Sequence, residues 1–357
     1  MSRVLCVNPG STSTKIAFFD DGTELYAATV HHSPEELAGF PRVADQAGFR
    51  TRLVIGMLGG AGVATEGLDA VVGRGGLTRP LDSGTYRVDE ALLADVAEGA
   101  RGEHASNLGA IVAARIAAFC RVPAYVVDPV MVDELDELAR FSGHPEIERR
   151  SIFHALNHKA VARRHARALG RPYEELNLIV AHLGGGVSVG AHRRGRVVDV
   201  NNALNGDGPF APERAGGLPT ASFARLCLES GRTHAQVRRL LAGAGGYVSL
   251  LGTNDGREVA RRAASGDARA ALVQDALAYQ VAKEVGRCAA VLRGAVDAIL
   301  LTGGLARNAV LVEAITGRVA WIAPVVVYEG EDEMAALAEG ALRVLHGEEE
   351  AKTYARA

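Results

Sequence analysis

The sequence predicts an α/β protein built from two similar domains, and three observations carry this prediction. A chain of 357 residues suits two domains of ordinary size. Short runs of β-branched residues alternate with alanine-rich segments of helical periodicity, which is typical of α/β folds. A strand–turn–strand pattern also occurs twice, once at the start of the chain and once near its middle.

Eight segments are expected to be strands, because each is a short apolar run bounded by Gly, Pro, Asp or Asn. They are residues 4–8, 14–19, 24–30, 124–128, 177–183, 187–192, 298–304 and 324–330. Four segments are expected to be helices: 106–120, 154–169, 267–292 and 333–345. The last starts at the end of the acidic run EDE, residues 331–333, which the dipole of a helix N-terminus favours.

The repeated pattern is seen by comparing VLCVNPGSTSTKIAFFDDG with LIVAHLGGGVSVGAHRRG. In each, an apolar strand ends at a polar residue, Asn8 or His182, and a glycine-containing turn leads into a second strand. A further turn is closed by Gly22 in the first segment and by Gly195 in the second. This layout predicts a duplicated fold with a phosphate-binding loop in each half.

Composition and charge argue against several classes of function. The net charge of −3 gives no basic surface for nucleic acid or an acidic membrane. The four cysteines are widely spaced, so neither a disulfide framework nor a zinc site is predicted. With no signal peptide pattern and no apolar run of about 20 residues, a soluble cytoplasmic protein without membrane partners is expected.

The two glycine-containing turns match neither common phosphate loop. After Gly10 the sequence STSTK lacks the second glycine of a Walker A loop, and a strand follows instead of a helix. From Gly184, Val189 stands where a dinucleotide fingerprint needs its third glycine. An ordinary polar β-hairpin is one interpretation of each turn. The other is a hairpin that cradles phosphate with backbone N–H groups, hydroxyls and one lysine.

The residues assigned to such cradles fall in three segments. The first comprises Asn8, Gly10, Ser11, Thr12, Ser13, Thr14 and Lys15, and the second Gly184, Gly185 and Gly186. The third is the turn LTGGLARN, where Gly303 and Gly304 follow an apolar strand. At those two glycines a nucleotide base or ribose can approach the backbone closely. Three such segments in one chain favour a nucleotide-binding protein over unrelated polar turns.

These segments resemble the acetate kinase family, and within it the butyrate kinase branch, of the superfamily that includes sugar kinases, Hsp70 and actin. The resemblance extends over nearly the whole chain, from residue 7 to about 342. It rests on NPGSTSTKIA, VGRGGLTRP, HASNLGAIVAARIA, VVDPVMVDEL, IFHALNHKAVARRHA, AHLGGGVSVGAH, DGPFAPERAGGLP, LGTNDGREV, LTGGLA and GEDEMAALAEGAL. It implies two actin-like α/β domains with a central cleft for the nucleotide and the acid.

The implied domains are residues 1–147 with 331–357, holding the first phosphate loop and the acid site, and residues 148–330, holding the second loop and the adenosine site. The implied reaction is reversible transfer of a phosphoryl group from ATP to butyrate or a branched short-chain acid, giving an acyl phosphate and ADP. A carboxylic acid of ordinary pKa is already ionised at neutral pH, so cations and dipoles matter more than a base. A homodimer or larger homo-oligomer is also implied.

The resemblance assigns catalytic roles to five residues. Arg74 holds the substrate carboxylate, and Arg214 is directed at the transferring phosphoryl group. Asp128 orients the nucleophile or the metal. His182 and His104 are the family's active-site histidines, His182 as a donor to the transition-state oxygens.

Mg²⁺ is implied as well, with Glu333 and Asn8 nearest to it, although Glu331 and Asp332 leave the register of that acidic run open. His154 and His158 stand four residues apart, but Ala155 occupies the position of the glutamate in HExxH. They are therefore interpreted as structural residues.

Other functions remain alternatives at this stage. An acetate or propionate kinase is the nearest, although NPGSTSTK, PERAGG and VGRGG depart from the usual acetate kinase segments and favour the butyrate branch. A sugar kinase would use Asp128 as its base. An actin-like ATPase, chaperone or nucleotide sensor would not need the two arginine motifs. No residue of the sequence identifies the preferred acyl chain length.

Overall fold

The computed structural model describes residues 2–63, 65–99 and 101–354, and the chain divides into two compact units. Unit 1 comprises Met1–Val132 and Asp332–Ala357, and unit 2 comprises Asp133–Glu331. From sequence the first boundary is expected after residue 147, whereas in the structure it follows Val132. The segment after Val132 belongs to unit 2 because Glu134 pairs with Lys159, and the amide of Asp136 donates to the carbonyl of Val198.

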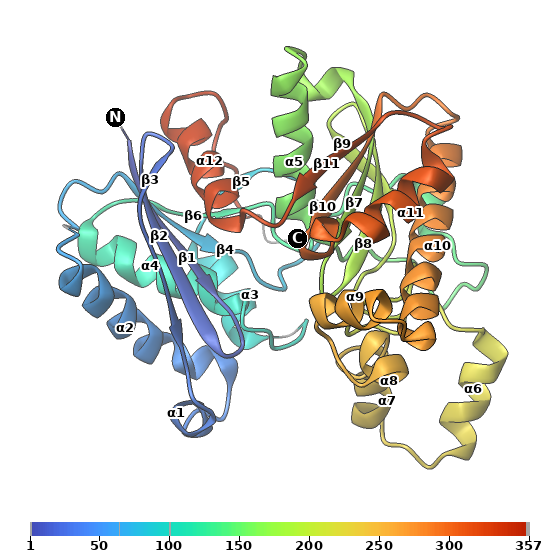
Figure 1. Cartoon of the computed structure of the whole chain (residues 1–357). Coiled ribbons are helices and arrows are strands. Elements are labelled where there is room, and N and C mark those ends of the chain that lie inside the picture. The colour runs from blue at the N-terminus through green and yellow to red at the C-terminus, as the bar shows by residue number, and fades with distance from the viewer. Residues whose placement is uncertain (1, 64, 100, 355–357) are drawn as a thin grey trace. The chain divides into compact units, whose positions relative to one another are not determined.

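Unit 1 contains a mixed six-stranded sheet of order β3-β2-β1-β4-β6-β5 (Figure 1). Its strands are β1 (Arg3–Pro9), β2 (Ser13–Asp20), β3 (Thr23–His31), β4 (Ala70–Arg74), β5 (Thr85–Arg87) and β6 (Ala124–Val127). Its helices are α1 (Pro34–Ala38), η1 (Val43–Gln46), α2 (Ala47–Gly60), α3 (Glu90–Glu98), α4 (Asn107–Cys120) and α12 (Glu333–Leu345). Strands β1, β4 and β6 run parallel, and β1, β2 and β3 form an antiparallel meander.

The two faces of this sheet are covered by different helices. Leu5, Val7 and Val71 pack with residues of α2 and α4 on one face. On the other face, Val127 of β6 lies against Gly340 of α12. Because side chains alternate along a strand, the residues on the α12 face include Asn8 and Arg74. The pleat therefore directs the polar ends of β1 and β4 toward the start of α12.

Unit 2 contains a five-stranded sheet of order β11-β10-β7-β8-β9 (Figure 1). Its strands are β7 (Asn177–Leu183), β8 (Val187–Arg193), β9 (Arg196–Val200), β10 (Ala298–Gly303) and β11 (Val325–Glu329). Its longer helices are α5 (Ala155–Ala168), α6 (Thr220–Glu229), α7 (His234–Leu241), α9 (Gly256–Ala264), α10 (Ala268–Val291) and α11 (Ala309–Val319). Its short helices are η2 (Glu137–Arg140), η3 (Tyr173–Glu175), α8 (Tyr247–Leu251) and η4 (Gly304–Arg307).

Helices also cover both faces of the second sheet. Ile179, Ala181 and Leu183 pack into the core that contains α10 and α11. Leu178 and Val180 pack with Val161 and Ala162 of α5 on the opposite face. By the same alternation, His182 lies on the α5 face.

The predicted duplication is visible in the two strand orders. In unit 1 the meander β1-β2-β3 is followed by β4, parallel to β1, and by β6, parallel to β4. In unit 2 the meander β7-β8-β9 is followed by β10, parallel to β7, and by β11, parallel to β10. Asn8 near the end of β1 and His182 near the end of β7 therefore occupy equivalent positions.

All eight predicted strands and all four predicted helices are present. The strands β4, β5 and β9 and several helices are not predicted from sequence, because their apolar runs are short or their helical stripes weak. Of the strands that the sequence does not predict, β4 matters most for the site, because Arg74 is its last residue. Within the residues described, no helix has the length and apolar character needed to cross a membrane.

Gly73 and Gly109 allow the backbones of β4 and α4 to approach each other closely at Arg74. A Cβ atom at Gly109 of α4 would overlap the carbonyl of Arg74, and one at Gly73 would overlap the carbonyl of Gly109. The backbones of α4 and β4 thus approach each other closely beside Arg74, the residue predicted to bind the substrate carboxylate. Gly109→Ala is expected to lower the free energy of unfolding by about 3 kcal/mol, measured by urea denaturation.

The matched control is Gly56→Ala on α2, where a Cβ atom would meet nothing within 4 Å. Alanine there should raise the free energy of unfolding by up to about 1 kcal/mol, because glycine disfavours a helix interior. Wild-type stability in Gly109→Ala would contradict the close approach.

Candidate functional site

In unit 1, three predicted site residues gather at one edge of the sheet. Asn8 lies near the end of β1, Arg74 ends β4, and Asp128 directly follows β6. The register pairs Val7 with Gly73 and Arg74 with Val127, so the carboxyl ends of β1, β4 and β6 lie side by side. The carboxyl ends of parallel strands in α/β sheets are the usual place for ligands.

Glu333, the first residue of α12, joins Arg74 and Asn8. Arg74 Nη1 lies 2.8 Å from Glu333 Oε1 and 3.0 Å from Oε2, and Asn8 Nδ2 donates to Oε2 at 2.6 Å. Asp332 instead accepts the Ala335 amide as the helix N-cap, and Glu331 Oε1 lies 3.3 Å from His182 Nε2 in unit 2. Of the three acids whose register the sequence leaves open, Glu333 is therefore the one that joins Asn8 and Arg74.

Asp128 is buried and has a strained backbone. Its φ is 38°, which is rare for a residue other than glycine, and its Oδ1 accepts hydrogen bonds from Ser83 Oγ (2.6 Å) and the Gly84 amide (2.8 Å). Strained residues that the surrounding structure holds in one conformation are concentrated at functional sites. The carboxylate is therefore fixed in direction at the end of β6.

The first predicted phosphate loop is the turn between β1 and β2. The Gly10 amide donates to the Ser13 carbonyl at 2.8 Å, closing the turn. Ser11 and Thr12 are exposed at its tip, and no described residue accepts from their backbone amides. Thr14 differs from the expectation that its hydroxyl faces phosphate. It is buried, and its Oγ1 lies within 3.0 Å of Arg50 Nη1 and His32 Nε2, because the pleat turns it inward.

In unit 2, His182 is buried at the end of β7 with both ring nitrogens engaged. Its Nδ1 lies 2.8 Å from Asn157 Oδ1, and its Nε2 faces Glu331. An amide oxygen only accepts, so the proton must reside on Nδ1. His182 therefore donates from Nε2 only as an imidazolium.

His154 is interpreted from sequence as a structural residue, and in the structure it contacts the predicted site residue His182. Its ring stacks on that of His182 with centroids 3.8 Å apart, and its Nδ1 lies 2.9 Å from Ser188 Oγ. It is the N-cap residue of α5, three residues before Asn157. No sequence signal beyond its position before that helix predicts the stacking, since it depends on how α5 packs on β7.

The second predicted loop, Gly184–Gly186, is crowded by charged and ring groups. A Cβ atom at Gly184 would lie 2.7 Å from His182 Nε2, and one at Gly186 would lie 3.5 Å from His154 and 3.8 Å from Arg214 Cγ. Within the described residues, the amides of Gly185 and Gly186 have no acceptor. The open N–H group of Gly186, beside an arginine and a histidine, suits an anion, whereas a Cβ atom at Gly185 would lie 3.7 Å from Glu213 Oε2.

Arg214 lies in the loop that follows β9 and is about three-quarters buried. Its Nε is buried without a hydrogen-bond partner among the described residues, and its nearest carboxylate, that of Glu213, is 3.7 Å away. Burial lowers the pKa of Arg214 below its usual value, against a weaker opposing effect of Glu213. A buried guanidinium donor without a partner is costly, and a bound anion would satisfy it.

His104 lies in the segment before α4. Its Nδ1 accepts from the Ser106 amide at 3.2 Å and is 2.7 Å from Ser106 Oγ. These contacts do not test a role in the reaction, so the assignment of His104 to the site stays a prediction.

A chain of buried polar side chains lies beside His154 on the α5 side of the second sheet. Tyr173 OH lies 2.6 Å from His192 Nδ1, His192 Nε2 lies 3.2 Å from His158 Nδ1, and His158 Nε2 lies 2.9 Å from Ser188 Oγ. Ser188 in turn meets His154. Burial lowers the pKa of both His158 and His192 well below 6.5, so both rings stay neutral in the folded protein.

These two histidines predict acid sensitivity of the fold. Below pH 6.5 the unfolded chain binds protons that the folded chain does not, so the free energy of unfolding should fall by about 1.4 kcal/mol per pH unit for each histidine. Urea unfolding between about pH 7.5 and pH 5 measures this slope. His192→Gln should reduce the slope by one histidine's share, whereas the same substitution at exposed His234 should not. An unchanged slope in His192→Gln would contradict the neutral buried pair.

The third predicted segment, Gly303 and Gly304, ends β10. Gly303 has φ of 93°, and a Cβ atom there would clash with the backbone of Leu183, so glycine is required. A Cβ atom at Gly304 would meet nothing within 4 Å. The backbone is therefore open at Gly304, as a nearby ligand would need.

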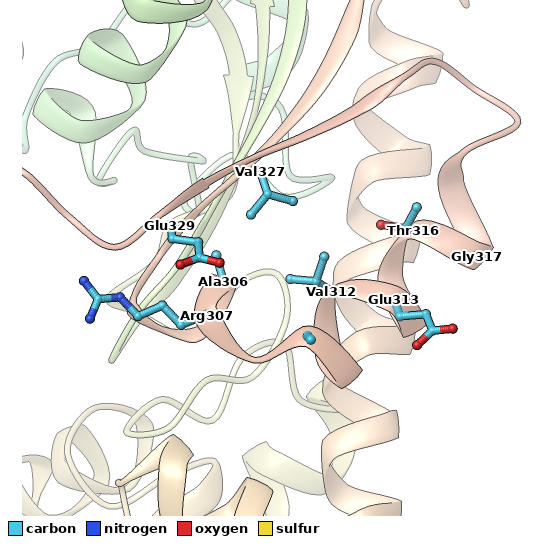
Figure 2. Close-up of a pocket in the computed structure, with 9 residues that line it drawn as sticks. Ala306, Arg307, Val312, Glu313, Thr316, Gly317, Val327 and Glu329 are labelled. Atoms are coloured by element: carbon cyan, nitrogen blue, oxygen red, sulfur yellow. The ribbon is translucent and has the colours of Figure 1, made fainter.

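A cavity of about 550 Å³ borders the same turn on the side of α11 and β11. Val312 and Val327 lie at its centre, Glu329 and Arg307 at one end, and Glu313 near Thr316 at the other (Figure 2). Its volume is that of a small-molecule site. Ala306 and Arg307 of this turn line it, whereas Gly303 and Gly304 do not.

The predicted metal site can be judged by its donor atoms. Among the described residues there is no cluster of three or more His, Cys, Asp or Glu side chains placed to hold a metal. Near Asn8 and Arg74 the carboxylate is that of Glu333. Mg²⁺ in kinases is commonly held by one or two carboxylates, phosphate oxygens and waters. These residues fit a metal that arrives with a nucleotide.

Comparison with known proteins agrees with this arrangement. The Acetokinase family matches residues 144–322. Over 99% of its length and all of the relative's, the chain is 54% identical to butyrate kinase 1 of Clostridium acetobutylicum. It is 51% identical to butyrate kinase 2 of that organism, over 99% of each chain.

The chain belongs to the acetokinase family. The family predicted from its motifs, and the prediction of a kinase, are thereby confirmed. Two solved acetate kinases share the fold. Acetate kinase of Porphyromonas gingivalis matches with a TM-score of 0.82 at 21% identity, over 97% of this chain and 100% of that one. The Entamoeba histolytica enzyme matches with a TM-score of 0.76 at 17% identity, over 96% and 99%. The predicted actin-like α/β fold is confirmed.

Proposed function

We propose that this chain transfers the terminal phosphoryl group of ATP to butyrate, forming butyryl phosphate and ADP reversibly. The observation that carries the proposal is the 54% identity to a butyrate kinase over 99% of this chain. The geometry fits it, since both units present cations and N–H groups at the ends of their central strands. Isobutyrate and other short branched acids belong to the same substrate class.

The chemistry requires little proton transfer. A carboxylate oxygen of butyrate, already ionised at neutral pH, attacks the γ-phosphorus of ATP. A carboxylate oxygen–phosphorus bond forms, the bond from that phosphorus to the β–γ bridging oxygen breaks, and ADP leaves with the bonding electrons. Catalysis then depends on position and on stabilising negative charge.

In unit 1, we propose that Arg74 binds the substrate carboxylate. It would use guanidinium N–H groups other than those of Nη1, which pairs with Glu333. Asp128, held by Ser83 and Gly84, orients the acid or the metal. Mg²⁺ bound to the nucleotide would neutralise phosphate charge, with Glu333 and Asn8 as the nearest protein groups. His104 is assigned to the same site on the resemblance to the family.

In unit 2, we propose that Arg214 and His182 stabilise the transferring phosphoryl group. The donors are Arg214 Nε, which has no partner among the described residues, and His182 Nε2. Because Asn157 Oδ1 accepts from Nδ1 of His182, Nε2 donates when the ring is an imidazolium. The open amides of Gly185 and Gly186 and the backbone at Gly303 and Gly304 are assigned to ATP. In unit 1, the turn of Gly10 to Ser13 and Lys15 are assigned to phosphate.

The test is acyl phosphate formation with Mg·ATP, trapped as hydroxamate, over acetate, propionate, butyrate, isobutyrate and valerate. Glycerol serves as a hydroxyl control. The highest kcat/KM should be found with butyrate or isobutyrate. A highest kcat/KM with acetate or propionate would support acyl phosphate formation but contradict butyrate as the preferred acid. Phosphorylation of glycerol alone would favour a sugar kinase.

We also propose that the protein acts as a homodimer or larger homo-oligomer in the cytoplasm. The support is the resemblance to the family, and size-exclusion chromatography with light scattering measures the assembly. A monomer at micromolar concentration would reject it.

A further inference from the structure

Arg50 is an arginine in the apolar stripe of a helix. The buried residues of α2 are Ala47, Arg50, Val54 and Leu58, which follow the helical period along one face. Arg50 is completely buried, whereas Arg52 on the same helix is exposed. A charged group in such a stripe is costly unless its donors are satisfied.

The donors of Arg50 are satisfied by the first phosphate loop. Its Nη1 donates to the carbonyls of Gly10 (2.8 Å) and Ser13 (2.7 Å) and to Thr14 Oγ1 (3.0 Å). Its Nη2 lies 3.3 Å from the Ser11 carbonyl. Gln46 Oε1 accepts from Nε and Nη2, and these two hydrogen bonds fix the orientation of the guanidinium plane.

This contact sets the direction of the turn. The Thr12 carbonyl accepts from the His32 amide at 2.8 Å, so the carbonyls of all four residues from Gly10 to Ser13 are engaged. Peptide N–H and C=O groups point in opposite directions, and the amides of Ser11 and Thr12 are the ones left open. Carbonyl oxygens that would repel a phosphate are thus held on the inner side.

Arg50 also brings charge that no described carboxylate neutralises, since its bonds are to carbonyl, hydroxyl and amide oxygens. Burial lowers its pKa to about 10, which leaves the guanidinium protonated at neutral pH. A buried cation acts over a longer range than an exposed one, because less water screens it.

We propose that Arg50 is the positioning residue of the first phosphate loop: it turns the loop amides outward and supplies a buried positive charge beneath the ATP phosphates. The inference rests on the proposed function for the identity of the ligand. It concerns only phosphate binding, so adenosine, which has no phosphate, is the control ligand.

The experiment compares binding of Mg·ATP and of adenosine by calorimetry in the wild type, Arg50→Met, Arg50→Lys and the matched control Arg52→Met. Arg50→Met should raise the Kd of Mg·ATP on the order of 10- to 100-fold and leave the Kd of adenosine within about twofold. Arg50→Lys keeps the charge but cannot bridge several carbonyls, so a smaller loss is expected. Arg52→Met should bind both ligands normally.

Thermal unfolding shows which variants fold. Folded Arg50→Met with wild-type affinity for Mg·ATP would overturn the proposal, as would equal losses for Mg·ATP and adenosine. If Arg50→Met does not fold, Arg50→Lys decides: a weaker Mg·ATP affinity with normal adenosine binding supports positioning, and unchanged Mg·ATP affinity rejects it. Wild-type protein that binds Mg·ATP but makes no acyl phosphate would refute the proposed function alone.

Discussion

Replacing Arg214 with alanine is expected to lower kcat about 10³-fold, with the KM for butyrate little changed. The guanidinium is directed at charge that develops on the phosphoryl group during transfer, so its loss affects the transition state more than the bound acid. Steady-state kinetics with butyrate and Mg·ATP give both constants.

Stability separates this role from a structural one. Because Arg214 Nε is buried without a partner among the described residues, folding already bears that cost. Arg214→Ala should therefore unfold at or above the wild-type temperature while losing activity. Exposed Arg225 of unit 2, changed to alanine, is the matched control and should keep wild-type kcat. A folded Arg214→Ala protein with normal kcat would remove this residue from the reaction.

Replacing Arg74 with alanine is expected to raise the KM for butyrate about 100-fold and to lower kcat about 10-fold. A guanidinium–carboxylate pair with two charge-assisted hydrogen bonds is worth enough binding energy for such an effect. The fall in kcat follows from loss of alignment, and from release of Glu333, which Arg74 contacts at 2.8 Å.

Arg74→Lys is the matched variant, because it keeps the charge and loses the planar fork. Its KM for butyrate should fall between those of the wild type and the alanine variant, and the KM for ATP should change little in both. Equal KM values for butyrate in all three proteins would show that the acid binds elsewhere.

The local elements of the fold are predictable from sequence because their signals lie within short segments. The runs that form β1, β2, β7, β8 and β10 are apolar, and turn residues bound them. The repeated strand–turn–strand layout predicts the duplication that the two sheets show. The strand ends marked by Asn8 and His182, and the glycines that follow them, are therefore recognisable from the amino-acid sequence alone.

The partners of these residues are not recognisable in the same way, because they come from distant parts of the chain. Asn8 meets Glu333 from 325 positions away, and Arg74 meets it from 259. The pattern EDE gives no reason to prefer Glu333 over its neighbours. The packing of α12 on the sheet separates them, since it places Glu333 beside Arg74 and leaves Asp332 to cap the helix.

The sequence by itself determined the fold class, the duplicated hairpins and the family, because these are encoded in local periodicity and in motifs spread along the chain. The tertiary structure alone decided that Thr14 faces inward, that His154 stacks on His182, and that buried Arg50 holds the first loop. Each of these depends on which face of a helix meets which strand. Local sequence specifies an apolar stripe, but it does not specify the groups that the stripe will contact.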